Sequence, residues 1–230
     1  MEDYYIVKLV GLGVISWAAI FILVRMIFPK LSFNSCNRIV STIHAFGAVT
    51  LSSLSVQDWS CPVCPTASKS SPFQMQAIAV TLAYLIYDLV CCLFDKQIDH
   101  ANSVHHFVSI IGLGAGLGYE MCGSEMVAAL WITEISSPFL HMRELLKELG
   151  YKDTDLSLAA DVSFAVVFTL ARMVGGPYLS YVTLSADNPQ LIKAMALGLQ
   201  LVSAFWFYKI ARMVKYKLFK RSTQHSSRAA

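Results

Sequence analysis

The chain alternates long apolar stretches with short polar connections. Crossing the hydrocarbon core of a bilayer takes about 20 predominantly apolar residues. Seven stretches reach or approach that length, and they span residues 6–28, 38–56, 73–94, 102–122, 124–146, 156–184 and 189–213. The second is short and polar at its ends, and the fifth contains Glu134 and Pro138. The pattern predicts an all-α membrane protein with about seven transmembrane helices.

Two of these stretches need separate comment. The first follows Glu2 and Asp3 instead of a basic segment and is longer than a signal-peptide core, so we expect a transmembrane helix there. The sixth contains Gly175, Gly176 and Pro177. Glycine and proline inside a helix bend or end it, so an interruption is expected at this point.

The composition supports a membrane location. Of the 230 residues, 56% are hydrophobic and 14% are charged, and the mean hydropathy is +0.55. A soluble domain carries about 25% charged residues, so this chain has too few for a surface that faces water. The net charge of +3 is modest and no basic block resembles a nucleic-acid-binding arm, so no nucleic-acid partner is expected.

The basic residues predict an orientation. Connections that face the cytosol carry an excess of Lys and Arg. With seven crossings, the odd-numbered connections share one side with the C-terminal tail, and that side collects Arg25, Lys30, Arg38, Lys96, Lys147 and Lys152. We therefore expect a luminal N-terminus and a cytosolic C-terminus. The chain divides into a first helix and connection (1–37), a helical domain (38–215) and a basic cytosolic tail (216–230).

The six cysteines do not form the framework of a disulfide-rich domain, because most lie in or beside apolar stretches. Cys61 and Cys64 are different, since they lie in the polar connection 58–71, which is luminal in this scheme. They fit a disulfide, a redox motif, half of a metal site or two unpaired thiols, and the sequence leaves these alternatives open. A zinc site needs further ligands that the sequence does not provide, so no metal or cofactor is predicted.

Two adjacent histidines, His105 and His106, stand one turn inside the fourth stretch. Ionisable residues inside a bilayer are costly and mark functional sites by default. Asp88 in the third stretch and Glu134 in the fifth are expected at similar depth, and a carboxylate can orient an imidazole for proton transfer. His100 completes a pattern that looks like a di-iron histidine box, but such sites need about eight histidines and the chain has six.

A wider polar set completes this predicted layer on the cytosolic half, with a role in substrate binding. Its members are His44, Ser137, His141, Asp161 and Arg172. In a continuous fifth helix, Glu134, Ser137 and His141 share one face, and the spacing of Asp161 and Arg172 also places them on a common face. Structural alternatives exist for single members: packing for His44, a headgroup position for His141, a helix cap for Asp161 and a hydrogen-bonding post for Arg172.

These residues resemble the TLC-domain family, which includes the ceramide synthases. The resemblance rests on the pair Tyr87–Asp88, on His105–His106, on Arg172, and on an acidic residue before a Ser-Ser-Pro-Phe-Leu run, which here reads Glu134, Ser136, Ser137, Pro138, Phe139 and Leu140. It covers roughly residues 38–215. It implies six helices, those of stretches two to seven, bundled around a central cavity, with the first helix outside.

The resemblance also implies chemistry. In ceramide synthases the double histidine is associated with acyl transfer from acyl-CoA to a sphingoid amine. Carried over, His105 or His106 would act as base or acyl-accepting nucleophile, while Asp88 and Glu134 would orient and polarise the reacting groups. Acyl-CoA would then be a co-substrate.

The sequence departs from ceramide synthases at several positions. It has Thr133, Glu134 and Ser137 where they have a His-Asp-x-x-Asp cluster, and His141 aligns with a later Glu. It is closer to the small TLC-domain proteins linked to membrane lipid composition. We therefore expect a multi-pass protein of the endoplasmic reticulum that acts in lipid homeostasis by binding or modifying an acyl lipid. The alternatives are an acyl-CoA-dependent acyltransferase and, third, a transporter or assembly factor.

Overall fold

A computed structural model describes the backbone of residues 3–94 and 100–229, and the side chains of residues 4–94 and 102–215. His100 and the side chains of the tail 216–230, which includes His225, lie outside the described side chains. The described chain is helical apart from its connections. Its elements are α1 (Asp3–Ile27), α2 (Phe33–Ser55), α3 (Pro72–Phe94), α4 (His100–Tyr119), α5 (Gly123–Glu134), α6 (Ser137–Glu148), α7 (Asp155–Phe168), the π-helical segment η1 (Thr169–Gly175), α8 (Gly176–Ser185) and α9 (Gln190–Ala229).

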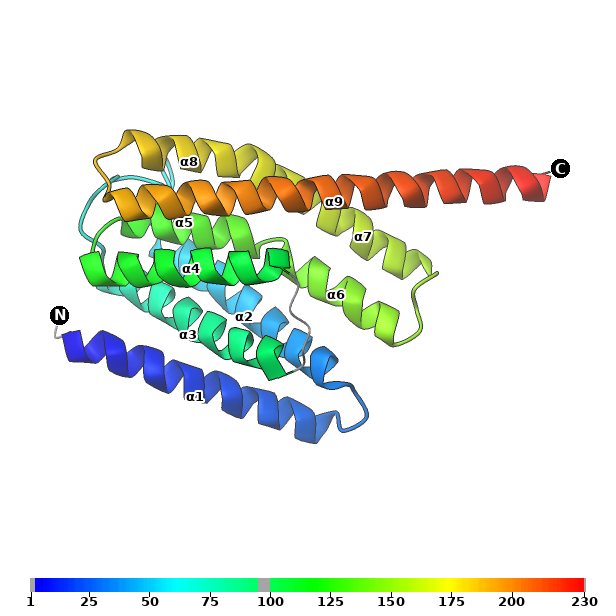
Figure 1. Ribbon diagram of the computed structural model, residues 1–230, viewed down its shortest axis with the longest axis horizontal. Helices are drawn as coiled ribbons and strands as arrows, with labels where there is room; N and C mark the ends of the chain where they lie inside the picture. The colour runs from blue at the N-terminus through cyan, green and yellow to red at the C-terminus, as the bar shows by residue number, and fades with distance from the viewer. Residues whose placement is uncertain (1–2, 95–99, 230) are drawn as a thin grey trace.

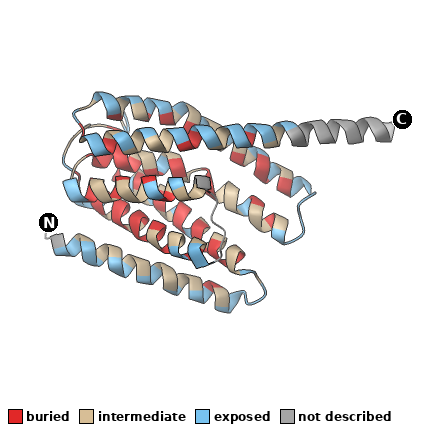
Figure 2. Cartoon of the chain, viewed as in Figure 1, coloured by how far each residue is buried: buried red, intermediate tan, exposed pale blue. Residues whose placement is uncertain are grey.

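The helices form a layered bundle with α1 on its edge (Figure 1). Helix α1 packs against α3 and α2, and its outer side exposes large apolar residues such as Val7, Leu12 and Ile15 (Figure 2). The described residues include four helices that are long and apolar enough to cross a membrane: Tyr4–Ile27, Pro72–Phe94, Asp155–Ser185 and Gln190–Lys215. An exposed apolar surface of this extent fits a protein surrounded by lipid.

The buried core lies where α2, α3 and α5 meet. Cys36 and Val40 of α2 pack into one cluster with Ile78 of α3 and Leu130 of α5, and all are nearly or fully inaccessible. Figure 2 shows buried residues concentrated in these inner helices. Several polar side chains are buried with them. Those without a hydrogen-bond partner in the protein are the ones that a ligand could use.

Capping residues explain where two of the helices begin. The Ser32 side chain accepts a hydrogen bond from the backbone N–H of Ser35 at the start of α2. Thr154 does the same for Ser157 at the start of α7. Ser and Thr at such positions satisfy an N–H that has no partner inside the helix. The expectation that Asp161 caps this helix is wrong, because Thr154 is the cap.

The fifth predicted stretch is two helices instead of one. Helix α5 ends at Glu134 and α6 begins at Ser137, with Pro138 in the first turn of α6. Proline has no backbone N–H to donate, so it is favoured in the first turn of a helix and disfavoured in the helix interior. The prediction of one continuous helix is therefore wrong, but Glu134 still contacts the side chain of Ser137 across the break.

The predicted interruption of the sixth stretch is present as a π-helical segment. Residues Thr169–Gly175 connect α7 to α8, and Pro177 lies in the first turn of α8. The chain changes direction here without leaving helical structure (Figure 1). The common face expected for Asp161 and Arg172 assumed a regular α-helix, and Arg172 lies inside the π-helical segment, so that spacing argument does not apply.

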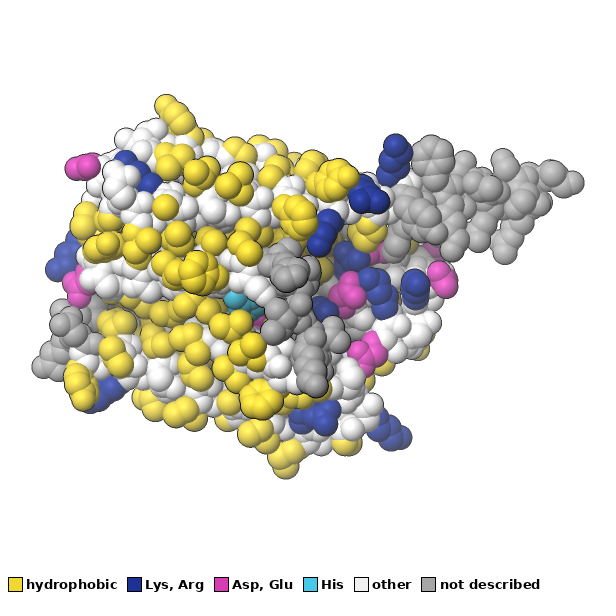
Figure 3. All heavy atoms as spheres, in the orientation of Figure 1, with side chains coloured by type: hydrophobic (Ala, Val, Ile, Leu, Met, Phe, Trp, Pro, Cys, Tyr) yellow, Lys and Arg dark blue, Asp and Glu magenta, His cyan; other side chains and the backbone are white. Residues whose placement is uncertain are grey.

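Side-chain types are not spread evenly over the surface. On the face drawn in Figure 3, hydrophobic side chains form broad bands along the bundle, and Lys and Arg gather toward the end from which the C-terminus leaves. Helix α9 runs past the bundle at that end as one helix to Ala229, so no break in the backbone separates the tail 216–230 from it.

Candidate functional site

A cavity lies among α3, α4, α5, α8 and α9, with η1 at one end. Its empty volume is about 930 Å³, part of which is open to the outside. Most of its lining is apolar, including Leu85, Val108, Leu130, Met195 and Leu199. A cavity with this lining suits an alkyl or acyl chain.

Four ionisable residues line this cavity. Three are predicted site residues: His105 from α4, Glu134 from the end of α5, and Arg172 from η1. The fourth, Glu125, lies in the first turn of α5. The Arg172 Nη2 donates a hydrogen bond of 2.5 Å to the carbonyl oxygen of Thr133. Arg172 and Glu134 also attract each other electrostatically. The structure therefore brings an imidazole, a carboxyl group and a guanidinium together at one end of the cavity.

The guanidinium of Arg172 is held by aromatic rings as well. It lies over the rings of Phe168 and Trp206, 5.1 Å and 5.6 Å from their centroids. Its Nε and Nη1 have no hydrogen-bond partner within the described part of the chain. π-Helical segments often occur at functional sites, and this one presents a buried cation with unused donors.

His105 lies in the cavity beside the same tryptophan. Its ring centroid is 5.0 Å from that of Trp206. Its Nδ1 is buried and makes no hydrogen bond to any residue that the structure describes. The rings of His105 and His106 are steeply inclined, at 75°, and His106 does not contribute to the cavity lining. The two adjacent histidines therefore have different surroundings.

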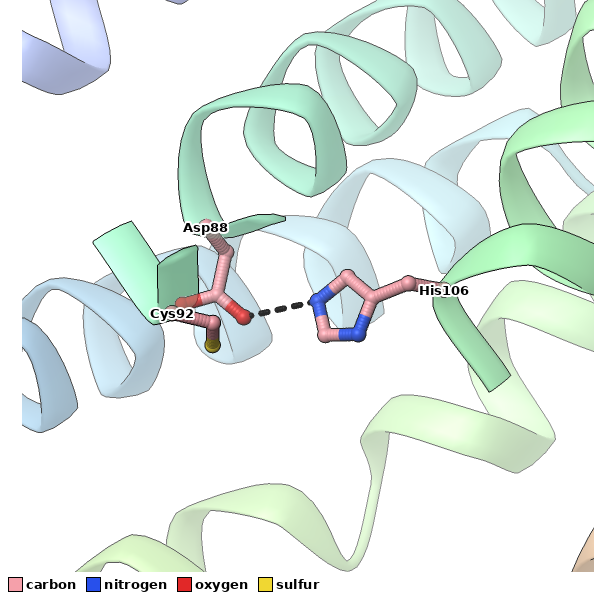
Figure 4. Close-up of side chains that lie close together, drawn as sticks. All are labelled: Asp88, Cys92 and His106. Atoms are coloured by element: carbon pink, nitrogen blue, oxygen red, sulfur yellow. Dashed lines mark hydrogen bonds and ion pairs between the residues drawn. The ribbon is translucent and has the colours of Figure 1, made fainter. Parts of the chain in front are cut away.

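His106 is paired with Asp88 outside the cavity (Figure 4). The Nε2 of His106 is 2.9 Å from Oδ2 of Asp88, and its Nδ1 is 2.9 Å from the carbonyl oxygen of Asn102. The other carboxylate oxygen of Asp88 accepts a 2.7 Å hydrogen bond from Asn37. Tyr87 in turn donates its hydroxyl to the Asn37 side-chain oxygen at 2.8 Å. The network joins α2, α3 and α4.

These contacts limit what His106 can do. A carbonyl oxygen and a carboxylate only accept hydrogen bonds, so both ring nitrogens of His106 face acceptors. A neutral imidazole donates from one nitrogen only. His106 therefore donates from both as an imidazolium, or Asp88 carries the proton. In both arrangements the ring has no lone pair left for a substrate.

The same place brings three potential metal ligands together. One ligand atom from each of Asp88, Cys92 and His106 lies within 4.8 Å of the others, and Figure 4 shows the three side chains converging. However, the imidazole and carboxylate atoms that would face an ion are hydrogen-bonded to each other. Binding a metal there would require breaking that bond, so the geometry fits a hydrogen-bonded ion pair better than a ligand set.

His44 has a packing environment. Its ring stacks on Tyr84 at 3.7 Å between centroids, with only 7° between the planes, and meets Trp17 edge-on at 5.6 Å. The contacts join α2 to α3 and α1. His44 does not line the cavity, and its ring packs between helices.

Asp161 forms an ion pair instead of lining the cavity. Its Oδ1 is 3.0 Å from Nε of Arg143, which connects α7 to α6. Arg143 also lies 3.3 Å from Glu144 and over the ring of Phe164. The pair is nearly inaccessible, so it links two helices more directly than it serves a ligand.

The last two predicted residues lie on α6. Ser137 donates to the carbonyl oxygen of Thr133 at 3.4 Å, across the break between α5 and α6. His141 interacts electrostatically with Asp88, and neither residue lines the main cavity. Ser137 does line a second hollow of about 760 Å³ empty volume, which shares Arg172 with the first. Arg172 therefore lies where the cavity and the second hollow meet.

The sequence did not point to every residue that matters. Asn37, Tyr84, Arg143 and Trp206 were not singled out, although they hold or contact the predicted site residues. Arg143 carried a usable signal, because it is a charge within a stretch expected to be buried. The others are common in packing roles, and their partners are far away in the sequence.

Comparison with known proteins identifies the class. The sequence model of the TLC domain matches residues 34–212. TLC domain-containing protein 4-B of Danio rerio is 29% identical over 201 residues, covering 80% of this chain and 75% of that protein. A TLC domain-containing protein of Acanthamoeba polyphaga mimivirus is 25% identical over 148 residues, covering 62% and 74% respectively. The chain is a membrane protein that belongs to the TLC-domain family.

Proposed function

We propose that this protein binds an acyl lipid within the bilayer and acts in membrane lipid homeostasis. The observation that carries the proposal is the cavity, because its lining is mostly apolar and carries ionisable residues toward its ends. An acyl chain would occupy the apolar part, and a carboxylate or phosphate group would meet Arg172, whose Nε and Nη1 have no partner in the described residues. The second hollow, which shares Arg172 with the cavity, would be the entry route.

The placement of basic residues supports an orientation in the membrane. Basic residues at the end of the bundle where the C-terminus leaves favour a cytosolic C-terminus. The proposed ligand would then enter from the cytosolic leaflet, and the endoplasmic reticulum is the compartment we expect.

A second candidate function is acyl transfer from a thioester such as acyl-CoA. One observation favours it: His105 lines the cavity with an unpartnered Nδ1, whereas the lone pairs of His106 are in use. His105 would attack the thioester carbonyl through its unprotonated nitrogen and break the C–S bond, and its N–H proton would pass to the departing sulfur, which leaves as the thiol. An amine or hydroxyl would then attack the acyl-imidazole and break its C–N bond, and its proton would pass through Glu134 to the departing imidazole. Asp88 and His106 would position α4, and would not touch the substrate.

The proposal can be tested by filling the cavity. Ala196 lines the cavity, while Ala204 on the same helix α9 is exposed and does not. We expect Ala196→Phe to lose co-purifying acyl lipid in native mass spectrometry and Ala204→Phe to retain it. Equal lipid occupancy in both folded variants would contradict an internal site.

The transferase candidate needs its own readout. After incubation with a long-chain acyl-CoA, the intact mass of the wild type should increase by one acyl group. The increase should be absent from His105→Gln. If bound lipid is present without any covalent adduct, the protein binds lipid and does not transfer it.

A further inference from the structure

The far end of the cavity carries an acidic residue that neither the predicted site nor the acyl-transfer chemistry uses. Glu125 lies in the first turn of α5 and lines the cavity together with Thr81 and Thr183. Glu134 lies nine positions further along the same helix. At a rise of about 1.5 Å per residue, the two carboxylates are separated by roughly 14 Å along the helix axis. The cavity therefore has two polar ends.

One oxygen of Glu125 is held firmly by the protein. Its Oε1 accepts hydrogen bonds from the backbone N–H of Ala67 at 2.8 Å and from the side-chain amide of Asn188 at 3.1 Å. The same amide nitrogen also donates to the carbonyl oxygen of Thr183 at 2.9 Å. The Asn188 oxygen accepts from the thiol of Cys122 at 2.8 Å. These bonds fix where the carboxylate lies.

The loop that supplies Ala67 is itself well anchored. Residues 56–71 contain the Cys61–Cys64 disulfide, so in this structure the two cysteines are neither unpaired thiols nor metal ligands. The backbone N–H of Ser70 donates to the carbonyl oxygen of Glu120, and the backbone N–H of Cys122 donates to the carbonyl oxygen of Ser68. The loop thus covers the start of α5 and holds Glu125 from one side.

The other oxygen of Glu125 is unused. Oε2 is buried and has no hydrogen-bond partner among the described residues, and the whole residue is only 3% exposed. A buried polar atom without a partner is unfavourable, and more so if it is charged. Because Oε1 is engaged by the loop and by Asn188, Oε2 is the oxygen available to a molecule in the cavity. A carboxylate oxygen accepts hydrogen bonds, so its partner must be a donor.

We propose that Glu125 forms a second polar subsite, which binds the ammonium or hydroxyl group of a long-chain lipid. This inference rests on the proposed function, because it requires the cavity to hold an alkyl chain. The two ends then select opposite chemistry. Arg172 takes an anionic or accepting group, and Glu125 takes a donor, with an ammonium favoured over a hydroxyl by its charge.

The test compares two ligands that differ only in their head: dodecylamine and dodecanoate. Native mass spectrometry of detergent-purified protein gives the affinity for each. Glu125→Gln keeps an oxygen for Ala67 and Asn188 but replaces Oε2 by an NH₂ group. We expect it to weaken dodecylamine binding about tenfold, the size of a lost charge-assisted hydrogen bond, and to leave dodecanoate unchanged. Arg172→Gln should show the reverse pattern.

A surface variant controls for general charge effects. Glu120→Gln removes a carboxylate that lies at the same end of the bundle, paired with the exposed Lys69, and should alter neither affinity. Equal dodecylamine affinity in wild type and Glu125→Gln, with dodecanoate bound normally, would overturn the subsite alone. Failure of the wild type to bind either ligand would overturn the proposed function and the subsite together.

The wild type alone provides a second measurement that does not depend on the folding of a variant. Dodecyltrimethylammonium carries the same charge and chain as dodecylamine but has no N–H donor. We expect dodecylamine to displace bound lipid and the quaternary analogue to be at least several times weaker. Equal potency of the two would overturn hydrogen bonding to Glu125.

Discussion

His106 and Asp88 are joined directly, with Nε2 and Oδ2 2.9 Å apart, while His105, the neighbour of His106, lines the cavity on its own. A helix turns by about 100° per residue, so two consecutive side chains cannot share an environment. In this protein the consequence is a division of roles. One histidine stabilises the contact between α3 and α4, and the other is available to a ligand.

The first prediction concerns this pair. Asp88→Asn should lower the free energy of unfolding by about 3 kcal/mol, because it removes one partner of a buried ion pair. His106→Gln should have a similar effect, and the double variant should cost less than the sum. Unfolding in detergent micelles, analysed as a double-mutant cycle, measures the coupling. Cys92→Ser should retain most of the stability, and strictly additive effects of the first two would show that the residues do not interact.

The second prediction concerns the contact of α1 with α3. A Cβ added at Gly13 would lie 2.7 Å from the Cβ of Ala83, which cannot move without the helix. Gly13→Ala should therefore destabilise the docked helix by about 1–3 kcal/mol, the usual cost of overpacking. Gly11→Ala is the matched control, because its Cβ would meet nothing within 4 Å, and it should be neutral or slightly stabilising. Thermal unfolding of both variants gives the change in stability. An equal change in the two would mean that α1 is not closely packed against α3 at Gly13.

The third prediction concerns topology. The Cys61–Cys64 disulfide lies in the loop 56–71, at the end of the bundle opposite the C-terminus. A membrane-impermeant maleimide should label these cysteines only after reduction, and only from the side opposite a C-terminal tag. Sealed vesicles of both orientations provide the measurement, with Cys61→Ser/Cys64→Ser as the unlabelled control. Labelling from the same side as the tag would mean that an even number of membrane crossings separates loop and tail.

How far the sequence predicts the structure differs between levels. Apolar length alone located the helices, because long apolar stretches without charges have few alternatives. It missed the break before Ser137, since hydropathy does not register the geometry that Pro138 imposes. Asp88 and His106 were predicted to lie at a similar depth, and in the structure they are in contact. Their pairing, by contrast, depends on helix rotation, which hydropathy does not encode.

The remaining site residues show why a layer of polar groups is not yet a site. Asp161 pairs with Arg143, and the ring of His44 stacks on Tyr84, so each contacts a partner on another helix. Such pairings are tertiary and leave no trace in local spacing. Glu125 was overlooked for the opposite reason, because an acidic residue in the first turn of a helix is ordinarily explained by the helix dipole.

The last prediction concerns acid sensitivity where α6 meets the start of α2. One oxygen of the Glu148 carboxylate accepts a hydrogen bond from the backbone N–H of Ser32. The other oxygen accepts one from the side-chain hydroxyl of Ser35. These bonds hold the pKa of Glu148 below its usual value. A depressed pKa means that the stabilisation is present above the unfolded value, about 4.3, and is lost as the pH falls through the lower folded pKa.

The size of this effect is limited by exposure. Glu148 lies at the surface, where solvent screens the interaction, so Glu148→Gln should cost about 0.5 kcal/mol or less near neutral pH. The difference in melting temperature between wild type and Glu148→Gln should shrink toward zero in acid. Asp153→Asn, in the polar connection after α6, removes the same charge without these bonds and serves as the control. A difference that does not change with pH would mean that the two serines do not bind the ionised carboxylate.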